Sequence, residues 1–217
     1  MKIVYIVGGN GFARECYHNL SCIIKKDTEL AFGGFLGHGG YGKTVDYKNL
    51  QQFYKGEVAE HEFKDDEYAI IGAGLPVLRK KIYEELKIRN IKFYNLITPD
   101  VSIAEGTKIQ EANIIIGNTS ISVNCDIGIC NVFNGSVIIG HDTEIGNFNF
   151  FGPRSQALGN ARMGCDNTIG ANAILLPHSK IGDNNKIAPL SAVYKGCKNN
   201  CYMSGNPAMK IGNVEND

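Results

Sequence analysis

The chain has 217 residues, and its 22 Lys and Arg residues balance its 22 Asp and Glu residues. Because nucleic-acid surfaces need clustered positive charge to follow phosphates, this balance argues against a nucleic-acid-binding protein. The chain has no apolar stretch long enough to cross a membrane, and its first apolar segment, residues 1–7, is too short for a signal peptide. We therefore expect a cytoplasmic protein with no membrane insertion.

Residues 1–97 alternate strand patterns with helix patterns. In chain order we expect a strand at 2–7, a helix at 12–24, a strand near 30–36, an amphipathic stretch at 46–54, a strand at 68–71, a helix at 76–89 and a strand at 91–97. The second helix begins with Pro76, whose missing N–H is tolerated at the first helical position. The alternation predicts a small parallel sheet in a Rossmann-like α/β domain that ends near residue 97.

A glycine-rich turn, Gly8-Gly9-Asn10-Gly11, follows the first expected strand and opens the first helix. Free backbone N–H groups and the positive end of a helix dipole favour an anion there, such as a phosphate. A redox dinucleotide fits less well, because Arg14 stands where the third glycine is expected and 35–38 lack the ribose-binding acid. The turn is thus a tight turn without a ligand, a nucleotide phosphate site, or a degraded dinucleotide site.

From Ile103 to Val193 every sixth residue is apolar, for sixteen steps without a gap. Four positions after each of them, from Thr107 to Cys197, the side chain is small. A period of six is the signature of a parallel β-helix. Three hexads make a triangular coil of about eighteen residues, so sixteen hexads predict roughly five coils, about 25 Å tall at the usual strand spacing. Seven of the apolar residues are followed by Gly, which we expect to relax the backbone at the turns.

The seven cysteines are odd in number and form no Cys-x-x-Cys pair, so neither a disulfide framework nor a zinc site is expected. Cys125 and Cys197 fall on small corner positions, where a thiol is an apolar filler. Only His141 and His178 lie in the repeat, and a metal hydratase of this type would need three histidines. We therefore expect no metal, and an exposed surface role for His178.

His141 lies two residues beyond a wall residue and should face outward beside Asp142. An imidazole suits proton transfer near neutral pH, and a carboxylate partner would fix its tautomer. Adjacent strand residues point in opposite directions, so this pairing requires a bend at the corner. The alternative is an exposed histidine without a catalytic role.

The hexads, the segment 134–142, the Gly159-Asn160 pair and the terminal segment 204–208 together resemble the hexapeptide-repeat acyltransferases. More narrowly, the opening residues 8–15 and the spacing from Asn134 to His141-Asp142 resemble the sialic-acid O-acetyltransferase (NeuD-like) group, which includes N-acetyltransferases of nucleotide-linked amino sugars. The resemblance implies a left-handed β-helix acyltransferase domain at 98–198, a C-terminal extension at 199–217 and a homotrimer with active sites between neighbouring prisms.

The resemblance also implies residue roles. His141 would be the general base, Asp142 would orient it, and acetyl-CoA would lie along the prism as co-substrate. The N-terminal domain would hold the nucleotide-linked sugar. The residues expected to bind substrate are Gly8, Gly9, Asn10, Gly11, Phe12 and Asn134, and those expected to contact the cofactor are Gly159, Ala171, Pro207 and Lys210.

Three positions depart from the family pattern. Phe150 replaces a second histidine of some N-acetyltransferases, and Pro189, which has no N–H, falls in a run whose N–H groups usually face coenzyme A. Gly37-His38-Gly39-Gly40 replaces the usual acidic residues after the second strand, which puts nucleotide recognition in question.

The leading hypothesis is an acetyl-CoA-dependent N-acetyltransferase acting on a nucleotide-linked amino sugar in surface glycan biosynthesis. A sugar O-acetyltransferase is the nearest alternative, because amine and hydroxyl acceptors both need a base. Two other classes remain open: a nicotinamide-dependent oxidoreductase, based on the glycine turn, and a non-catalytic trimeric scaffold, based on Phe150 and Pro189.

Overall fold

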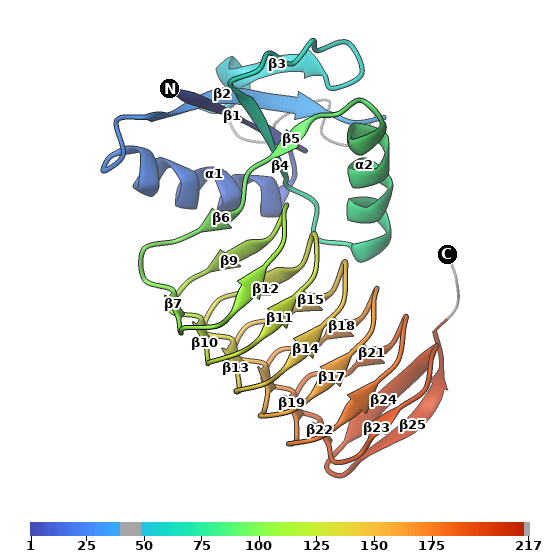
Figure 1. The fold of residues 1–217 in the computed structure, drawn as a ribbon. Helices are drawn as coiled ribbons and strands as arrows, with labels where there is room; N and C mark the ends of the chain where they lie inside the picture. The colour runs from blue at the N-terminus through green and yellow to red at the C-terminus, as the bar shows by residue number, and fades with distance from the viewer. Residues whose placement is uncertain (40–48, 215–217) are drawn as a thin grey trace. The chain divides into compact units, whose positions relative to one another are not determined.

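The structure is a computed structural model that describes residues 1–39 and 49–214. The chain divides into two compact units, Met1–Thr98 and Pro99–Asp217 (Figure 1). No helix among the described residues is long and apolar enough to cross a lipid bilayer.

The first unit contains, within its described residues, a five-stranded sheet of order β3-β2-β1-β4-β5. All its pairings are parallel. Its strands are β1 (Lys2–Val7), β2 (Leu30–Gly37), β3 (Tyr54–Glu57), β4 (Glu67–Ile71) and β5 (Lys92–Phe93), and its helices are α1 (Gly11–Ile24), the 3₁₀ helix η1 (Gln51–Phe53) and α2 (Pro76–Ile88). The central strand β1 is apolar and buries Val4, Ile6 and Val7, as expected of a parallel strand covered on both faces.

Most predicted elements of this unit are confirmed to within one residue at each end. The expected strand at 91–97 is wrong, because the chain forms two short strands, β5 and β6 (Leu96–Ile97), separated by Tyr94 and Asn95. In the expected amphipathic stretch, 46–48 lie outside the described residues, as does Gly40 of the altered segment. The rest of that stretch is η1 and the first residue of β3, a strand that the sequence did not indicate because it contains Gly56, with φ +105°.

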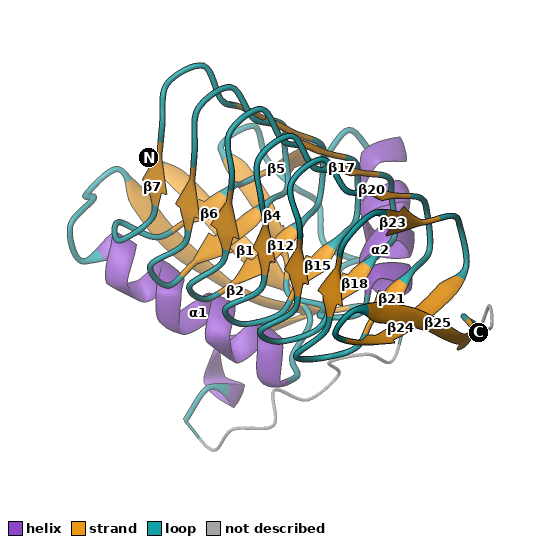
Figure 2. Cartoon of the chain, turned by 90° about the horizontal axis from the view of Figure 1, so that it is seen from below, coloured by secondary structure: helices purple, strands orange, loops and turns teal. Residues whose placement is uncertain are grey.

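The second unit is a parallel β-helix with three walls, whose strands stack in rows (Figure 2). The first wall contains β7 (Ser102–Ile103), β10 (Ser120–Ile121), β13 (Ile138–Ile139), β16 (Gln156–Ala157), β19 (Ile174–Leu175) and β22 (Ala192–Val193). The second contains β8 (Lys108–Ile109), β11 (Asp126–Ile127), β14 (Glu144–Ile145), β17 (Arg162–Met163), β20 (Lys180–Ile181) and β23 (Gly196–Cys197). The third contains β9 (Ile114–Ile116), β12 (Val132–Asn134), β15 (Phe150–Phe151), β18 (Thr168–Ile169), β21 (Lys186–Ile187) and β24 (Cys201–Gly205), followed by the antiparallel strand β25 (Ala208–Asn213).

Strands of one wall pair with residues eighteen positions away, as in Ile121 with Ile139 and Ile127 with Ile145. Three hexads per coil are thereby confirmed. The inward column is buried from Ile115 to Val193, and the rings of Phe133 and Phe151 stack inside it at 4.9 Å between centroids. Ile103 departs from the expectation: it is 39% exposed, because the column ends there.

The glycines after wall residues serve close packing and not, as predicted, backbone relaxation. They have no positive φ, and a Cβ on Gly152 would lie 2.9 Å from the N atom of Ala171 in the next coil. The left-handed conformation occurs instead three positions after each wall residue, at φ of 52° to 63° from Ala112 to Leu190 and at larger positive φ at Gly106 and Gly196. Several of these corner residues are Asn or Asp, which tolerate that conformation: Asn118, Asn124, Asp142, Asn160, Asp166, Asn172 and Asn184.

The last coil is two residues shorter than the others, because Lys180 pairs with Gly196 and Lys186 with Tyr202. Cys197 therefore stands opposite Ile181 in the wall column, and its predicted corner position is wrong. The first two walls hold six strands each in the described part of the chain, one coil more than the hexads predicted.

Candidate active site

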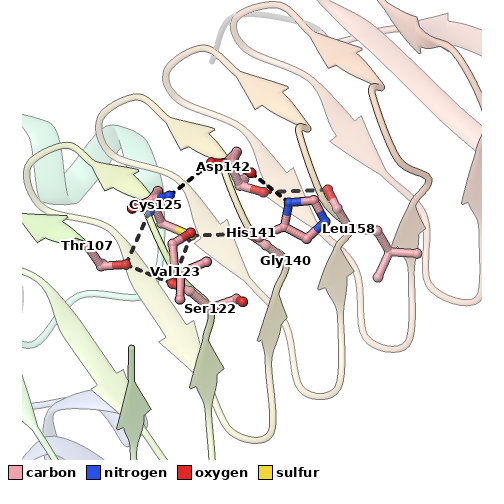
Figure 3. Close-up of polar contacts among 10 residues, drawn as sticks. Thr107, Ser122, Val123, Cys125, Gly140, His141, Asp142 and Leu158 are labelled. Atoms are coloured by element: carbon pink, nitrogen blue, oxygen red, sulfur yellow. Dashed lines mark hydrogen bonds and ion pairs between the residues drawn. The ribbon is translucent and has the colours of Figure 1, made fainter. Parts of the chain in front are cut away.

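His141 and Asp142 lie at the corner between β13 of the first wall and β14 of the second. Asp142 has φ +56°, and this bend turns the two neighbouring side chains toward each other. His141 Nδ1 lies 2.7 Å from Asp142 Oδ2 (Figure 3). Their side chains are 57% and 48% exposed, so a ligand can reach both.

The Asp142 carboxylate accepts a second hydrogen bond, from Asn124 Nδ2 at 3.3 Å. The hydrogen bonds from His141 and then from Asn124 hold the pKa of Asp142 below its usual range. An ionised carboxylate only accepts, so His141 Nδ1 carries the hydrogen. The neutral ring then presents a lone pair on Nε2, which is what a general base needs.

The other side of the imidazole faces Gly159, one coil further on. A Cβ on Gly159 would lie 2.6 Å from His141 Nε2 and 2.9 Å from Cε1, so only glycine leaves room for the ring. Within the described part of the chain, the N–H group of Gly159 has no hydrogen-bond partner. The corner therefore holds a base and, on Gly159 of the next coil, an N–H donor that has no partner among the described residues.

The backbone on both sides of His141 is fixed by neighbouring coils. Asn160 N donates to His141 O at 2.8 Å, and Asp142 N donates to Val123 O at 3.0 Å. Beneath the corner, the Cys125 thiol donates to Gly140 O at 3.2 Å (Figure 3). Burial raises the pKa of the Cys125 thiol, which leaves it a packing group and not a nucleophile.

The remaining predicted residues of the prism lie elsewhere. Asn134 ends β12, and Ala171 follows β18, so both lie at the corner between the third and first walls. Pro189, eighteen residues after Ala171, occupies that same corner, and Leu190 N donates to Ala171 O at 3.0 Å. Within one chain, Gly159 thus lies next to His141, whereas Asn134 and Ala171 lie at a different corner.

Two further predicted residues, Pro207 and Lys210, belong to the C-terminal hairpin. Pro207 follows a cis peptide bond between β24 and β25, and Lys210 is exposed on β25. The described part of the expected extension at 199–217 is thus a hairpin that continues the third wall through β24. Phe150, at the position of the second histidine, is half-buried on β15.

The glycine turn forms a separate candidate site in the first unit. A cavity of about 120 Å³ is lined by Gly8, Gly9, Asn10 and Phe12, but not by Gly11. Asn10 is the N-cap of α1 and makes no side-chain capping hydrogen bond.

Sequence reasoning missed the opposite side of this cavity, which is the loop Gly72-Ala73-Gly74 after β4. Arg79 of α2 is 1% exposed and donates to Gly74 O at 2.6 Å and to Ala73 O at 3.4 Å. A buried guanidinium therefore holds the loop and adds positive charge near the cavity. Gly72 and Gly74, which follow the predicted strand at 68–71, could have indicated this loop from the sequence.

Residues 160–195 match the family model of the bacterial transferase hexapeptide (six repeats). No curated protein sequence is significantly similar to the chain.

Solved structures resemble both units of this chain. The acetyltransferase domain of PglB from Neisseria gonorrhoeae, in complex with acetyl coenzyme A, matches with a TM-score of 0.85 at 15% identity, over 97% of this chain and 99% of that one. PerB from Caulobacter crescentus, in complex with CoA and GDP-perosamine, matches with a TM-score of 0.83 at 19% identity, over 98% of both chains. WeeI from Acinetobacter baumannii matches with a TM-score of 0.85 at 19% identity, over 97% and 100%. At such identities the likeness establishes a common fold.

Proposed function

We propose that the protein is an acetyl-CoA-dependent N-acetyltransferase that acts on a nucleotide-linked amino sugar in surface glycan biosynthesis. The observation that carries this proposal is the His141-Asp142 pair, held at a prism corner with the imidazole packed against Gly159. The common fold with acetyltransferases whose structures hold acetyl coenzyme A, or CoA with GDP-perosamine, supports it.

The chemistry is a direct transfer. The acceptor amine attacks the thioester carbonyl, a C–N bond forms, and His141 Nε2 takes the amine proton. The C–S bond then breaks, and the proton passes from the imidazolium to the leaving thiolate. Asp142 stabilises the imidazolium, and the Gly159 N–H is placed to donate to the oxyanion that forms between these steps. No cysteine nucleophile and no metal takes part.

The protein would be a homotrimer with a left-handed prism, in which each active site combines two corners from neighbouring copies; this would explain why Asn134 and Ala171 lie at a different corner from His141 in one chain. The outward residues of the first wall, which separates these corners, are uncharged: Ser120, Ile138, Gln156, Ile174 and Ala192. The second wall is charged, with Lys108, Asp126, Glu144, Arg162 and Lys180 facing outward. Interfaces are depleted in charge, so the first wall is the better contact surface.

The first unit is then a Rossmann-like nucleotide-sugar-binding domain. Its strand order matches the first part of the doubly wound order, and the turn from Gly8 to Phe12 lies at the carboxyl end of β1, where such sheets bind phosphates. Acetyl-CoA and nucleotide sugars are cytoplasmic metabolites, so we place the protein in the cytoplasm. Pro207 and Lys210 would contact the far end of the cofactor from the hairpin.

The test is transfer from acetyl-CoA to a panel of nucleotide-linked 4-amino sugars, with the acetylated product measured by mass spectrometry. His141→Ala should lower kcat/KM at least about 100-fold, the usual loss for a general base. His178→Ala is the matched control, because His178 is an exposed histidine on the same corner two coils further on. Activity of His141→Ala within about threefold of wild type would remove the assignment. Sugars with a hydroxyl in place of the amine separate O- from N-acetylation.

A further inference from the structure

We propose that His38 recognises the ribose of the nucleotide, with its Nδ1 atom accepting a hydrogen bond from a ribose hydroxyl. The inference rests on the proposed nucleotide-sugar substrate and names the residue that takes the place of the missing acid. It concerns the first unit alone.

His38 lies directly after β2, at the carboxyl edge of the sheet and next to the glycine turn. It lines the cavity of about 120 Å³ that also contains Gly8, Gly9 and Asn10. It also lines a second cavity, of about 470 Å³, with Lys81 and Glu85 of α2. The imidazole therefore lies between the space at the helix N-terminus and a larger neighbouring space.

One ring nitrogen of His38 hydrogen-bonds to another side chain of the protein. The residue is only 5% exposed, and Nε2 lies 2.6 Å from Glu85 Oε2. A carboxylate accepts, so Nε2 carries the hydrogen and Nδ1 of the neutral ring carries a lone pair.

The other ring nitrogen, Nδ1, is buried and makes no hydrogen bond with the described residues. Buried polar atoms are nearly always paired, so an orphaned acceptor indicates a missing donor. Of the two cavities, Glu85 lines the second and not the first. The two nitrogens lie on different sides of the imidazole, and Nε2 points to Glu85. The geometry therefore directs Nδ1 toward the first cavity, at the glycine turn.

A ribose hydroxyl is the donor that fits this place. In doubly wound sheets the phosphate lies at the N-terminus of the first helix, and an acid after the second strand accepts from the ribose. Here position 37 has no room for an acidic residue. A Cβ in place of the Gly37 hydrogen would collide with Glu57 and lie 2.9 Å from the Tyr54 hydroxyl. His38 Nδ1 offers the same accepting function without a negative charge beside the phosphates.

The experiment measures binding of UDP, GDP and CMP, and of their 2′-deoxy and 3′-deoxy forms, to the full-length protein by calorimetry. For the nucleotide that binds, removal of one ribose hydroxyl should weaken wild-type binding about fivefold to tenfold, the usual effect of one hydrogen bond. In His38→Leu, which has no acceptor, the ribose and deoxyribose forms should bind within about twofold of each other. In His38→Asn, whose Oδ1 lies near the former Nδ1, the preference should return.

His178→Leu is the control, because His178 is an exposed histidine of the second unit that lines neither cavity. A hydroxyl preference that persists in His38→Leu, or that is missing from the wild type, overturns the proposal. A wild-type protein that binds none of the three nucleotides overturns the nucleotide role of the first unit as well. Acetyl-CoA binding in the same calorimeter shows whether the transferase function fails with it.

Discussion

The His141 imidazole packs against Gly159 of the next coil. The ring occupies the space that the side chain of any other residue at position 159 would need. The hexad frame places these residues eighteen positions apart, on the same corner of successive coils. The contact fixes the side of the ring that carries Nε2, while Asp142 fixes the side that carries Nδ1. Ring orientation therefore depends on a glycine as much as on a carboxylate.

Gly159→Ala should keep the fold and lose activity. The new methyl group would lie 2.6 Å from Nε2, so the ring must turn away from the acceptor. We expect kcat/KM to fall about 10-fold to 100-fold, because small misplacements of a catalytic group have effects of this size. Gly212→Ala is the control, since nothing lies within 4 Å of its added Cβ. Equal activity of the two variants would contradict the contact.

Asp142→Asn should lower the rate. Because the pKa of Asp142 is lowered, its carboxylate stays ionised at every pH above its usual value and can stabilise the imidazolium that forms during transfer. The amide carries no charge, and its Nδ2 can donate to the ring in place of accepting from it, so kcat should fall at least about 100-fold in that pH range. Asp126→Asn, an exposed carboxylate of the second wall, should leave kcat unchanged. A rate of Asp142→Asn within about threefold of wild type would refute the role.

Asn124 acts through Asp142 and is a positioning residue. Its amide donates to Asp142 Oδ1 from the preceding coil, at a corner residue with φ +56°. Asn124→Gly removes the amide without backbone strain and should lower kcat about threefold to tenfold, with KM for acetyl-CoA unchanged. Asn172→Gly makes the same change at a corner with φ +57° that has no hydrogen bond to Asp142. Matching losses in both variants would assign the effect to the backbone.

The repeat could be predicted from the sequence because its period follows from the geometry of a three-sided coil. The inward column and the small corners are consequences of that period, and both are buried from Ile115 onward. The six-residue period no longer predicts which residues face inward once the coil length changes in the last coil. Cysteines at both 197 and 201 concealed the two-residue shortening, and Cys201, not Cys197, continues the corner by donating its N–H to Asn185 Oδ1 at 2.8 Å.

The candidate site was predictable only in part. The pairing of His141 with Asp142 depends on neighbouring residues and one bend, which the sequence shows. The contacts of Asn124 and Gly159 cross from coil to coil, and a search at a spacing of eighteen residues would have indicated them. Arg79 could not be found in this way, because a charged residue on an amphipathic helix is normally exposed, and its hydrogen bonds to the neighbouring loop carbonyls become visible only in the folded structure.

A ladder of buried asparagines stabilises the corner between the second and third walls: Asn113, Asn131, Asn149, Asn167 and Asn185. In each step the side-chain oxygen accepts the backbone N–H of the next asparagine, as from Asn167 N to Asn149 Oδ1 at 2.9 Å. The Asn149 amide also donates to Asn131 Oδ1 at 3.0 Å and to Gly164 O at 2.9 Å. The corner carbonyls and N–H groups are thereby satisfied where no strand can pair them.

Asn149→Ala should therefore destabilise the prism strongly. It leaves the buried Asn167 N–H and Gly164 O without their partners and removes one of two hydrogen bonds to Asn131 Oδ1, so we expect a loss of about 3 kcal/mol in the free energy of unfolding, measured by urea denaturation. Ser179→Ala is the matched control at a different corner, because the Ser179 hydroxyl is buried without a hydrogen-bond partner among the described residues. Its removal should change the free energy of unfolding by less than about 0.5 kcal/mol. If Asn149→Ala unfolds at the same urea concentration as Ser179→Ala, the corner is held by packing alone and the ladder contributes no stability.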